Sequence, residues 1–426
     1  MQHVQYAVIG AGISGLSFAA LCGSDSVAVL EADQHIGGYC RTIERDGFVW
    51  DYSGHFFHFK HPDVEAWLRR HMPDDEVRTV QRDSRIHFAD RLIDFPFQKN
   101  IHQLPQDDFI DCLYELHFRH ETFPADQPAA DFHAMLLQKF GRGIADRFLI
   151  PYNEKLYACD LRTLDVNAMG RFFPWADEDE IIRNFRRPDN SSYNASFTYP
   201  RRGAIRYVEA IARQLPPDTI HAGERVTAID LERRTLTTTR RALSWEHLIS
   251  SAPLPRLLEM TGEPAPAGML AGNRVLVFNL GFDRKGPEGV HWIYYPQRDV
   301  RFYRIGFYDN IFGTDRMSMY VEIGLPAEGP VDVSAERARV LADLRRVGVV
   351  TDHVVVAEHH VLLDPAYVHI TEQSQRFTDV TRDRLAAHGA HTIGRYGGWT
   401  YCSIEDNILE ARALAARLRG DEVPLP

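Results

Sequence analysis

A glycine-rich turn between a short strand and a helix lies within the first 31 residues and constrains the fold more than any other feature. The apolar run Val4–Ile9 predicts a strand, and the spacing of apolar residues over Leu16–Leu21 predicts a helix. Residues 10–15 join them with the sequence GAGISG, and a second apolar run, Val27–Leu30, ends at Glu31. This order of strand, turn, helix, strand and acid predicts the start of a parallel α/β sheet.

Each glycine of the turn has a physical role in binding a dinucleotide. Gly10 permits the tight turn, Gly12 lets backbone N–H groups approach a pyrophosphate, and Gly15 lets helix and strand pack closely. Glu31 lies 21 residues after Gly10, where its carboxylate can accept hydrogen bonds from ribose hydroxyls. Strand, helix and acid together therefore predict a Rossmann-like nucleotide site.

A second glycine pair, Gly37-Gly38, follows the acid and precedes Arg41 and Thr42. This segment resembles the extended FAD fingerprint of the amine oxidase and glutathione reductase superfamily, which simple NAD dehydrogenases usually lack. Gly38 would then belong to a second phosphate-cradling loop, and Arg41 would add positive charge beside the pyrophosphate. The alternative is an ordinary turn with a surface arginine. We expect FAD as the cofactor rather than NAD.

Charge and cysteine usage restrict the partners and the location. The chain has 426 residues and a formal net charge of −11, so we expect neither nucleic acid nor a membrane surface as a partner. Its five cysteines are scattered and the histidines lack metal-ligand spacing, so we expect no metal and a cytoplasmic protein without disulfides. An anionic ligand would need a local group of arginines to overcome the global charge.

The periodicity predicts an α/β protein whose nucleotide domain is assembled from discontinuous segments. Residues 1–60, 200–265 and 385–426 would form the Rossmann-like FAD-binding domain. Residues 61–199 would form a mostly helical insertion that contributes to the nucleotide and substrate region. Residues 266–384 would form an antiparallel-sheet domain that binds substrate.

The turn Ser53-Gly54-His55 follows an apolar strand pattern. It resembles the Gly-Gly-His turn of UDP-galactopyranose mutases, especially of the eukaryotic branch, in which the histidine lies near flavin N5. These mutases belong to the amine oxidase and protoporphyrinogen oxidase-like flavoproteins. The resemblance implies that Gly54 and His55 contact the flavin, and Ser53 stands where the family has glycine. A histidine packed in a turn is the alternative.

Two segments resemble the parts of this family that hold the nucleoside. Phe97 and Gln98 match a Pro-Phe-Gln-Asn-Asn segment near the base, although a turn with an apolar plug is an equal alternative. Asn153 and Tyr157 match a Tyr-Asn-x-Lys-x-Trp segment, with Tyr157 in the place of the tryptophan. The resemblance implies base and nucleoside contacts from these four residues.

Further matches imply a diphosphate site made of arginines and tyrosines. Arg171 and Arg304 correspond to arginines on the diphosphate, and Tyr294, Tyr367 and Tyr401 correspond to phosphate-binding tyrosines. Alternation along two adjacent strands would let Tyr294 and Arg304 point into one cleft. The alternatives are a surface charge for Arg171 and two amphipathic surface strands for the others.

The segment from Gly394 to Asn407 resembles the family's flavin-side residues, with Arg395 and Asn407 as the matches. A helix that begins near Asp406 could direct its N-terminal N–H groups at the flavin and favour its reduced, anionic form. A capped C-terminal helix without a ligand is the alternative.

The resemblance implies an isomerase that interconverts pyranose and furanose forms of a nucleotide-diphosphate sugar such as UDP-galactopyranose. The reaction would proceed through an adduct between the sugar and N5 of reduced FAD, with NADPH or another external reductant. His55 would position N5, and Arg171 and Arg304 would stabilise the departing diphosphate. The changes at Ser53 and Tyr157 leave a related pyranose or another nucleotide carrier open.

Two other functions share the N-terminal fingerprint. One is an FAD-dependent oxidase or desaturase of the amine oxidase or protoporphyrinogen oxidase type, and the other is a flavin-binding protein without catalysis. Tyr294, Arg304, Arg395 and Tyr401 favour a phosphate ligand over an amine or an apolar substrate.

Overall fold

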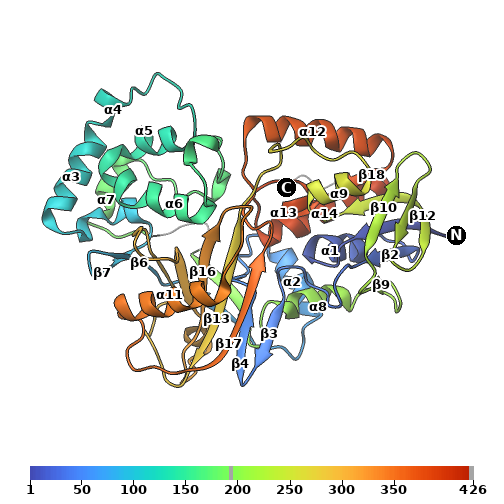
Figure 1. Ribbon diagram of the computed structural model, residues 1–426, viewed down its shortest axis with the longest axis horizontal. Helices are drawn as coiled ribbons and strands as arrows, with labels where there is room; N and C mark the ends of the chain where they lie inside the picture. Colours follow the sequence, from blue (N-terminus) through green and yellow to red (C-terminus); the bar gives the residue numbers. More distant parts are fainter. Residues whose placement is uncertain (191–194, 422–426) are drawn as a thin grey trace.

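The computed structural model describes residues 1–190 and 195–421 and confirms the predicted α/β class. Two large sheets lie side by side, with a group of helices beyond the second sheet (Figure 1). No helix within the described part of the chain is long and apolar enough to cross a membrane.

The first sheet is the nucleotide-binding type and is mostly parallel around β1. Its strand order is β10-β11-β12-β1-β2-β9, with β18 beside β12. The strands are β1 (Gln2–Ile9), β2 (Val27–Leu30), β9 (Ile220–His221), β10 (Val226–Asp230), β11 (Thr235–Thr238), β12 (Ala242–Ser250) and β18 (Ala390–Thr392). All of these strands come from the three sequence segments expected to form the FAD-binding domain.

Both faces of the first sheet are buried because alternate side chains of β1 enter two different cores. Val8 packs with α1 (Ile13–Leu21), α8 (Ile205–Ala212) and α14 (Ile404–Arg419) on one face. Ala7 packs on the other face with α9 (Leu254–Met260) and α12 (Glu372–Ala387). Such double burial explains why β2 and the second half of β1 are continuous apolar runs.

The second sheet has the order β17-β13-β16-β15-β14-β6-β7 and is mostly antiparallel. The strands are β6 (Ser84–Phe88), β7 (Arg91–Asp94), β13 (Arg274–Phe282), β14 (Trp292–Tyr294), β15 (Arg304–Phe307), β16 (Ser318–Leu325) and β17 (Val355–Leu363). One face packs on α11 (Val333–Arg346), and the other faces the helical region.

Two strands of the second sheet come from the region that the sequence predicts to be mostly helical. β6 and β7 form a hairpin whose turn residues, Ala89 and Asp90, have φ angles of 47° and 57°. Positive φ at both positions is the geometry of a type I′ turn, usually supplied by Asn-Gly. The hairpin extends the second sheet through parallel pairing of β6 with β14.

Helices fill most of the remaining insertion. They are α2 (Pro62–Arg70), α3 (Gln106–His117), α4 (Arg119–Thr122), α5 (Phe132–Ile144), α6 (Ile150–Tyr157) and α7 (Glu178–Asn184). The smaller elements are β3 (Thr42–Arg45), β4 (Phe48–Asp51), β5 (Val77–Gln81), β8 (Ser196–Pro200), α10 (Asp309–Phe312) and α13 (Gly394–Gly397). A large apolar core joins α5 and α6 to the second sheet, where α6 packs against β16 and its Tyr152 contacts Tyr294 of β14.

Candidate active site

A cavity of about 750 Å³ opens at the carboxyl ends of β1, β2 and β12. Ligands of open α/β sheets bind at this edge of the strands. The predicted cofactor residues that line it are Gly10, Gly12, Glu31, Gly38, His55, Arg395 and Asn407. The sequence pattern and the backbone therefore bring seven distant positions to one cavity.

The glycine turn leaves open space where a phosphate would lie. A Cβ atom on Gly12 would lie 3.9 Å from Gly38, its nearest neighbour, and both glycines line the cavity. Gly15 has a different role, because a Cβ atom there would lie 2.0 Å from the carbonyl oxygen of Gly10. The first pair thus keeps space for a ligand, and Gly15 allows the helix to approach the strand.

Glu31 is held at the cavity wall by backbone amides. Its Oε2 accepts a hydrogen bond from the N–H of Ala11 at 2.8 Å, and its Oε1 accepts one from Asp33 at 2.9 Å. An ionised carboxylate has further lone pairs, so these bonds orient Glu31 and leave acceptor capacity for a ribose.

Arg41 differs from the sequence prediction of a pyrophosphate contact. Its guanidinium pairs with Asp33 at 2.9 Å and donates to the carbonyl oxygens of His35 and Ile36. Arg41 is not among the residues that line the cavity. Because its donors are used by the loop over residues 33–36, Arg41 stabilises that loop instead.

His55 reaches the cavity from the turn after β4. The Nδ1 atom of His55 is buried and has no partner among the described residues. Burial lowers the pKa of His55 to about 4, so the imidazole is neutral at physiological pH. Gly54 allows this turn to approach β16, because a Cβ atom there would lie 2.5 Å from the hydroxyl of Tyr320.

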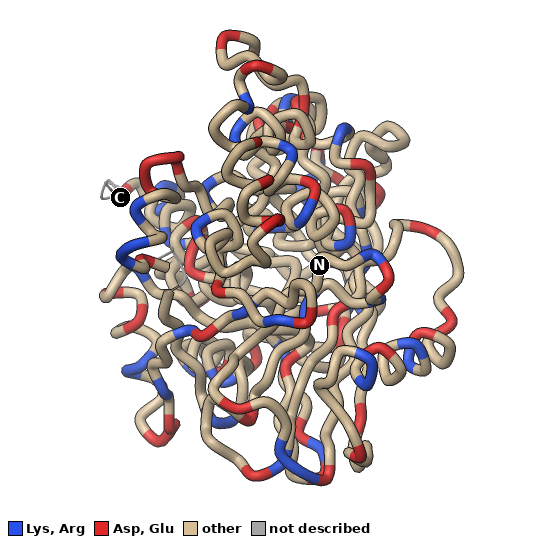
Figure 2. Tube along the Cα trace, turned by 90° about the vertical axis from the view of Figure 1, so that its left-hand side faces the viewer, with Lys and Arg blue, Asp and Glu red and all other residues tan. Residues whose placement is uncertain are grey.

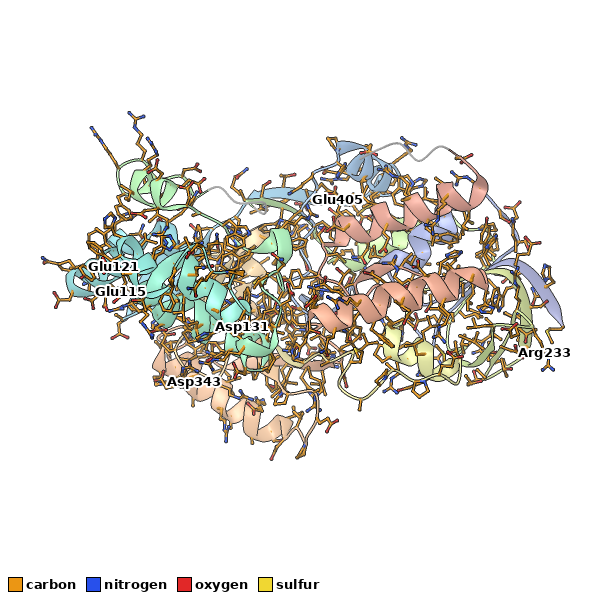
Figure 3. The ribbon with its side chains drawn as sticks, turned by 90° about the horizontal axis from the view of Figure 1, so that it is seen from above. Glu115, Glu121, Asp131, Arg233, Asp343 and Glu405 are labelled. Atoms are coloured by element: carbon orange, nitrogen blue, oxygen red, sulfur yellow. The ribbon has the colours of Figure 1, made fainter. Side chains whose placement is uncertain are left out.

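Arg395 and Asn407 connect the cavity to the start of α14. The Oδ1 of Asn407 accepts hydrogen bonds from the N–H of Arg395 and from the hydroxyl of Ser14, both at 3.0 Å. Ser403 caps α14, and Glu405, which is labelled in Figure 3, lies in the first turn of this helix. Its carboxylate accepts hydrogen bonds from the N–H groups of Lys60 and His61. The helix N-terminus is therefore fixed against the cavity.

A second cavity of about 110 Å³ lies between the helical region and the second sheet. The predicted substrate residues that line it are Asn153, Tyr294, Arg304, Tyr367 and Tyr401. Arg395 lines the first cavity and contacts two of these tyrosines, since its guanidinium is 4.2 Å from the ring centroid of Tyr401 and 5.5 Å from that of Tyr367. Cation–π contact of this kind stabilises the partly buried Arg395.

Arg304 is neutralised by a buried carboxylate that the sequence analysis did not identify. Glu322 is 1% exposed and accepts hydrogen bonds from Nε and Nη2 of Arg304, the latter at 2.9 Å. Glu322 is a single acid within the apolar strand β16, a pattern that gave no sign of an inward-facing side chain. Tyr152 was also missed, and it lines the smaller cavity beside Tyr294.

Arg171 is at the edge of the site rather than in its lining. Its guanidinium pairs with Asp406 in the first turn of α14 and lies 4.8 Å from the ring centroid of Phe172, which lines the smaller cavity. The side chain of Arg171 is 48% exposed. The structure therefore does not bring Arg171 together with Arg304.

Phe97 and Gln98 are buried behind the smaller cavity. Phe97 is fully buried and stacks on Phe148, which does line the cavity, at 5.0 Å. Gln98 donates a hydrogen bond to the carbonyl oxygen of Pro174, another lining residue. In this structure the two residues support the wall and do not expose their side chains to a ligand.

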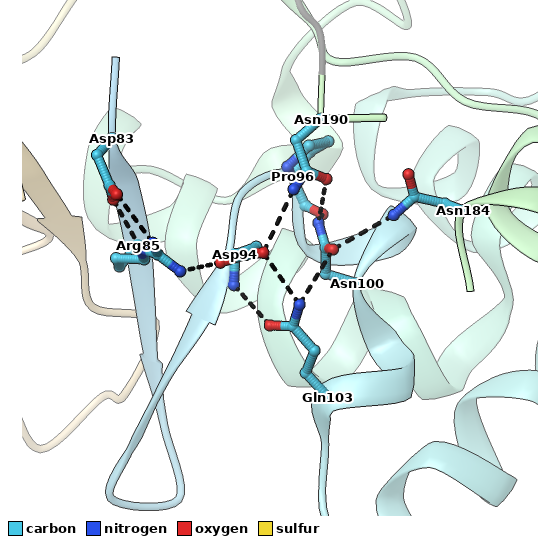
Figure 4. A network of polar contacts seen from close by, with 8 residues as sticks. All are labelled: Asp83, Arg85, Asp94, Pro96, Asn100, Gln103, Asn184 and Asn190. Atoms are coloured by element: carbon cyan, nitrogen blue, oxygen red, sulfur yellow. Dashed lines mark hydrogen bonds and ion pairs between the residues drawn. The ribbon is translucent and has the colours of Figure 1, made fainter. Parts of the chain in front are cut away.

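A polar network holds this supporting segment in place (Figure 4). Asn100 donates to the carbonyl oxygen of Pro96 at 2.9 Å and to Asn190 at 2.8 Å, and it accepts from Asn184. Gln103 donates to Asp94 at 3.1 Å and accepts from its N–H at 2.9 Å. Satisfied, partly buried networks of this kind help to fix a single backbone arrangement.

Tyr157 is fully buried at the C-terminus of α6, and it too lies outside the lining of the smaller cavity. Its ring packs edge-on against Tyr367 at 5.9 Å between centroids. The hydroxyl of Tyr157 has no hydrogen-bond partner in the described chain, and burial raises its pKa well above the ordinary value.

Charged residues of both signs are distributed along the chain rather than gathered in one region. Basic and acidic residues alternate along the trace on the side shown in Figure 2.

Within residues 1–190 and 195–421, no group of three or more histidine, cysteine or acidic residues could hold a metal. Arg225, Arg256 and Arg395 line the larger cavity, and Arg304 lines the smaller one.

The fold and the glycine-lined cavity define a dinucleotide-binding flavoprotein. A family model of the flavin containing amine oxidoreductases matches residues 13–419, and the chain belongs to this family. FAD is thus the expected cofactor, and the open glycine turn and the unpartnered atoms of His55 and Arg395 fit its phosphates and ring.

Solved structures share this fold over nearly their whole length. A reduced UDP-galactopyranose mutase matches with a TM-score of 0.89 and 24% identity over 99% of this chain and 94% of that one. A provisionally assigned protoporphyrinogen oxidase from Exiguobacterium sp. 255-15 has a TM-score of 0.75 and 14% identity, over 98% and 99%. A putrescine oxidase with redesigned cofactor binding has a TM-score of 0.67 and 14% identity over the same shares.

Proposed function

We propose that this protein is an FAD-dependent mutase that interconverts the pyranose and furanose forms of a nucleotide-diphosphate sugar. The observation that carries the proposal is the position of Arg395, which lines the larger cavity while its guanidinium contacts Tyr367 and Tyr401 of the smaller one. No acid within the described residues forms an ion pair with Arg395, so this partly buried cation is available to an anionic ligand that spans the two cavities.

The lining of the smaller cavity suits a phosphate rather than an amine. Arg395 would repel a cationic amine. The cavity also offers an amine no free carboxylate to pair with, because its walls are aromatic and Glu322 is already paired with Arg304. Tyrosine hydroxyls can donate hydrogen bonds to phosphate oxygens. The hydroxyl of Tyr294 accepts a hydrogen bond from the indole N–H of Trp292 at 2.9 Å, so its own proton remains available for a phosphate. Phenol donors bind an anion without adding further buried charge.

The residues of the chain have distinct tasks in this proposal. Reduced FAD in the larger cavity would supply the nucleophile for the anomeric carbon. Arg304 and Arg395 would stabilise the diphosphate as it leaves the sugar, and Tyr367 and Tyr401 would orient it. His55, neutral because of its lowered pKa, would hold the sugar beside the flavin without competing as a cation.

Binding a nucleotide sugar requires the smaller cavity to open. Its volume of about 110 Å³ is below the roughly 300–1,000 Å³ of typical ligand sites. The wall that contains Phe172 and Phe173 ends at Arg171, whose contact with Asp406 is partly exposed. If this wall moved, the guanidinium of Arg171 could release Asp406 and bind a phosphate of the ligand instead, which would bring Arg171 into the site.

The test is direct. The purified holoprotein is reduced with dithionite under anaerobic conditions and mixed with UDP-galactopyranose or UDP-galactofuranose, and the nucleotide sugars are separated by chromatography. Interconversion that stops when the flavin is reoxidised is expected. Persistent reduced flavin without interconversion of any UDP, GDP or dTDP sugar would contradict the proposal.

The family also contains oxidases. An oxygen-consumption assay on the same holoprotein distinguishes an oxidase from a mutase. Rapid oxygen consumption with a polyamine or a porphyrinogen, and none of the mutase reaction, would establish the oxidase alternative. We further propose that the protein is cytoplasmic and that NADPH is its reductant. Anaerobic bleaching of the flavin absorbance on addition of NADPH tests the choice of reductant.

A further inference from the structure

Ser53 departs from the Gly-Gly-His pattern, and the structure gives its hydroxyl a specific partner. Ser53 is buried, and its Oγ donates a hydrogen bond to Oε1 of Glu322. The same carboxylate accepts two hydrogen bonds from Arg304. A glycine at this position could not form the contact, so the serine adds a third donor to the buried pair.

The backbone of Ser53 is fixed from the other side. Its carbonyl oxygen accepts hydrogen bonds from the N–H of His55 at 2.7 Å and from the hydroxyl of Tyr308 at 3.1 Å. His55 lines the larger cavity and Arg304 the smaller one. Ser53 therefore lies in a continuous chain of hydrogen bonds between the two cavities.

We propose that Ser53 is a positioning residue that holds Glu322, and through it Arg304, in the orientation that binds the diphosphate. The inference rests on the proposed function, because it takes a nucleotide diphosphate as the ligand of Arg304. Hydrogen bonds to an ionised carboxylate are stronger than neutral ones, so the hydroxyl restricts the rotation of Glu322. Restricting Glu322 in turn restricts the planar guanidinium that it grips.

Ser318 provides a matched control for this role. It lies on β16, four residues before Glu322, and it is buried like Ser53. Its Oγ has no hydrogen-bond partner among the described residues. Ser318→Ala thus removes a buried hydroxyl from the same strand without touching the Glu322–Arg304 pair.

The experiment measures the dissociation constant for UDP by calorimetry on FAD-loaded protein, together with kcat and KM for the sugar nucleotide. Ser53→Ala is expected to weaken UDP binding about tenfold, which corresponds to about 1.4 kcal/mol. KM should rise more than kcat falls, Ser53→Thr should restore part of the affinity, and Ser318→Ala should match the wild type. The FAD content of every variant should remain that of the wild type.

A double-mutant cycle separates positioning from a general structural effect. In a Glu322→Met background, Ser53→Ala should change UDP affinity less than twofold, because methionine offers the Ser53 hydroxyl no comparable acceptor. An equal effect of Ser53→Ala in both backgrounds, or none in the wild-type background, would overturn the inference. Failure of the wild type itself to bind UDP would instead overturn the proposed function, and this inference with it.

Discussion

Tyr294 and Arg304 face each other as directly paired residues of β14 and β15, and both line the smaller cavity. Their closeness follows from the antiparallel register, which places both side chains on the same face of the second sheet. Glu322 is paired with Arg304 across the next strand, β16. Three neighbouring strands therefore build one wall of the site.

Arg304→Lys tests whether the geometry of the guanidinium matters beyond its charge. Lysine keeps the positive charge beside Glu322 but loses the planar fork that binds a carboxylate and a phosphate at once. We expect kcat/KM for the sugar nucleotide to fall at least about 100-fold, or about 2.7 kcal/mol of transition-state stabilisation. The FAD content, read from the absorbance spectrum, should not change.

Arg304→Ala is a less informative variant because it leaves Glu322 buried without a partner. Removing one member of a buried ion pair costs about 3–5 kcal/mol of stability. The double variant Arg304→Met with Glu322→Gln removes both charges and is the better control for folding. Wild-type turnover in Arg304→Lys would show that Arg304 serves only to neutralise Glu322.

Gly12 and Gly15 separate cofactor binding from folding. A Cβ atom on Gly12 would meet nothing closer than 3.9 Å, and its φ of −87° suits any residue, so Gly12→Ala should fold normally. It should nevertheless bind FAD at least tenfold more weakly, because the methyl group occupies the space kept for the pyrophosphate. Calorimetric titration of the apoprotein with FAD gives the affinity, and circular dichroism gives the fold.

Gly15→Ala provides the contrast. Its Cβ atom would lie 2.0 Å from the carbonyl oxygen of Gly10, so the helix and strand would have to separate. We expect loss of thermal stability even in the apoprotein, measured by differential scanning calorimetry. Normal FAD affinity in Gly12→Ala would refute the assignment of the turn as the phosphate site.

The local sequence predicts a feature well when neighbouring residues alone determine it. The glycine turn, Glu31 and the strand pair that carries Tyr294 and Arg304 are of this kind, because fixed spacing places them. Arg41 is not, because the partner that diverts it, Asp33, was not apparent as an acceptor in the sequence. Local pattern could not show which loop would use the donors of the arginine.

Burial by segments distant in the sequence is the second reason why the structure differs from the sequence prediction. Phe97 is covered by Phe148, which lies 51 positions further along the chain, so its exposure depends on how the helical region packs. Glu322 was missed because a lone acid in an apolar strand usually faces solvent, and only the position of Arg304 on β15 explains its burial. Both cases depend on tertiary contacts.

Arg171→Ala tests the role of the arginine at the edge of the site. The pair with Asp406 is partly exposed, with side-chain exposures of 48% and 27%, and exposed pairs contribute about 0–1 kcal/mol. Unfolding by urea should therefore change little, while UDP affinity should fall about tenfold if Arg171 exchanges Asp406 for phosphate. Unchanged UDP affinity would leave Arg171 as a surface ion pair only.

Asp406→Asn is the complementary variant, because it releases Arg171 without removing its charge. UDP affinity should then remain at the wild-type level or rise, since the phosphate no longer competes with a carboxylate. Asp406 also accepts the N–H of Ser403 in the capping box, and asparagine can accept the same hydrogen bond.

Lys155 joins α6 to the loop between β14 and β15 beneath the smaller cavity. Its Nζ donates to the carbonyl oxygens of Tyr295 at 2.8 Å, Gln297 at 3.0 Å and Phe302 at 2.5 Å. Burial lowers the pKa of Lys155 from 10.5 to about 7. The loop is also held by α11, whose Asp343 is labelled in Figure 3. Asp343 accepts a hydrogen bond from the N–H of Arg301 at 2.7 Å.

The lowered pKa of Lys155 predicts that stability rises with pH. Between about pH 7 and 10.5 the unfolded chain keeps the proton on Lys155 and the folded chain does not, so raising the pH favours folding. One such group contributes at most about 1.4 kcal/mol per pH unit.

Lys155→Met should remove this slope and, because the carbonyl oxygens around Nζ lose their donor, lower the stability by about 1–3 kcal/mol. Urea unfolding at pH 7, 8 and 9 measures both effects, with the exposed Lys139→Met as the control. The same pH dependence in Lys155→Met and the wild type would show that Lys155 keeps its proton in the folded chain, as a cation bound by three carbonyl oxygens.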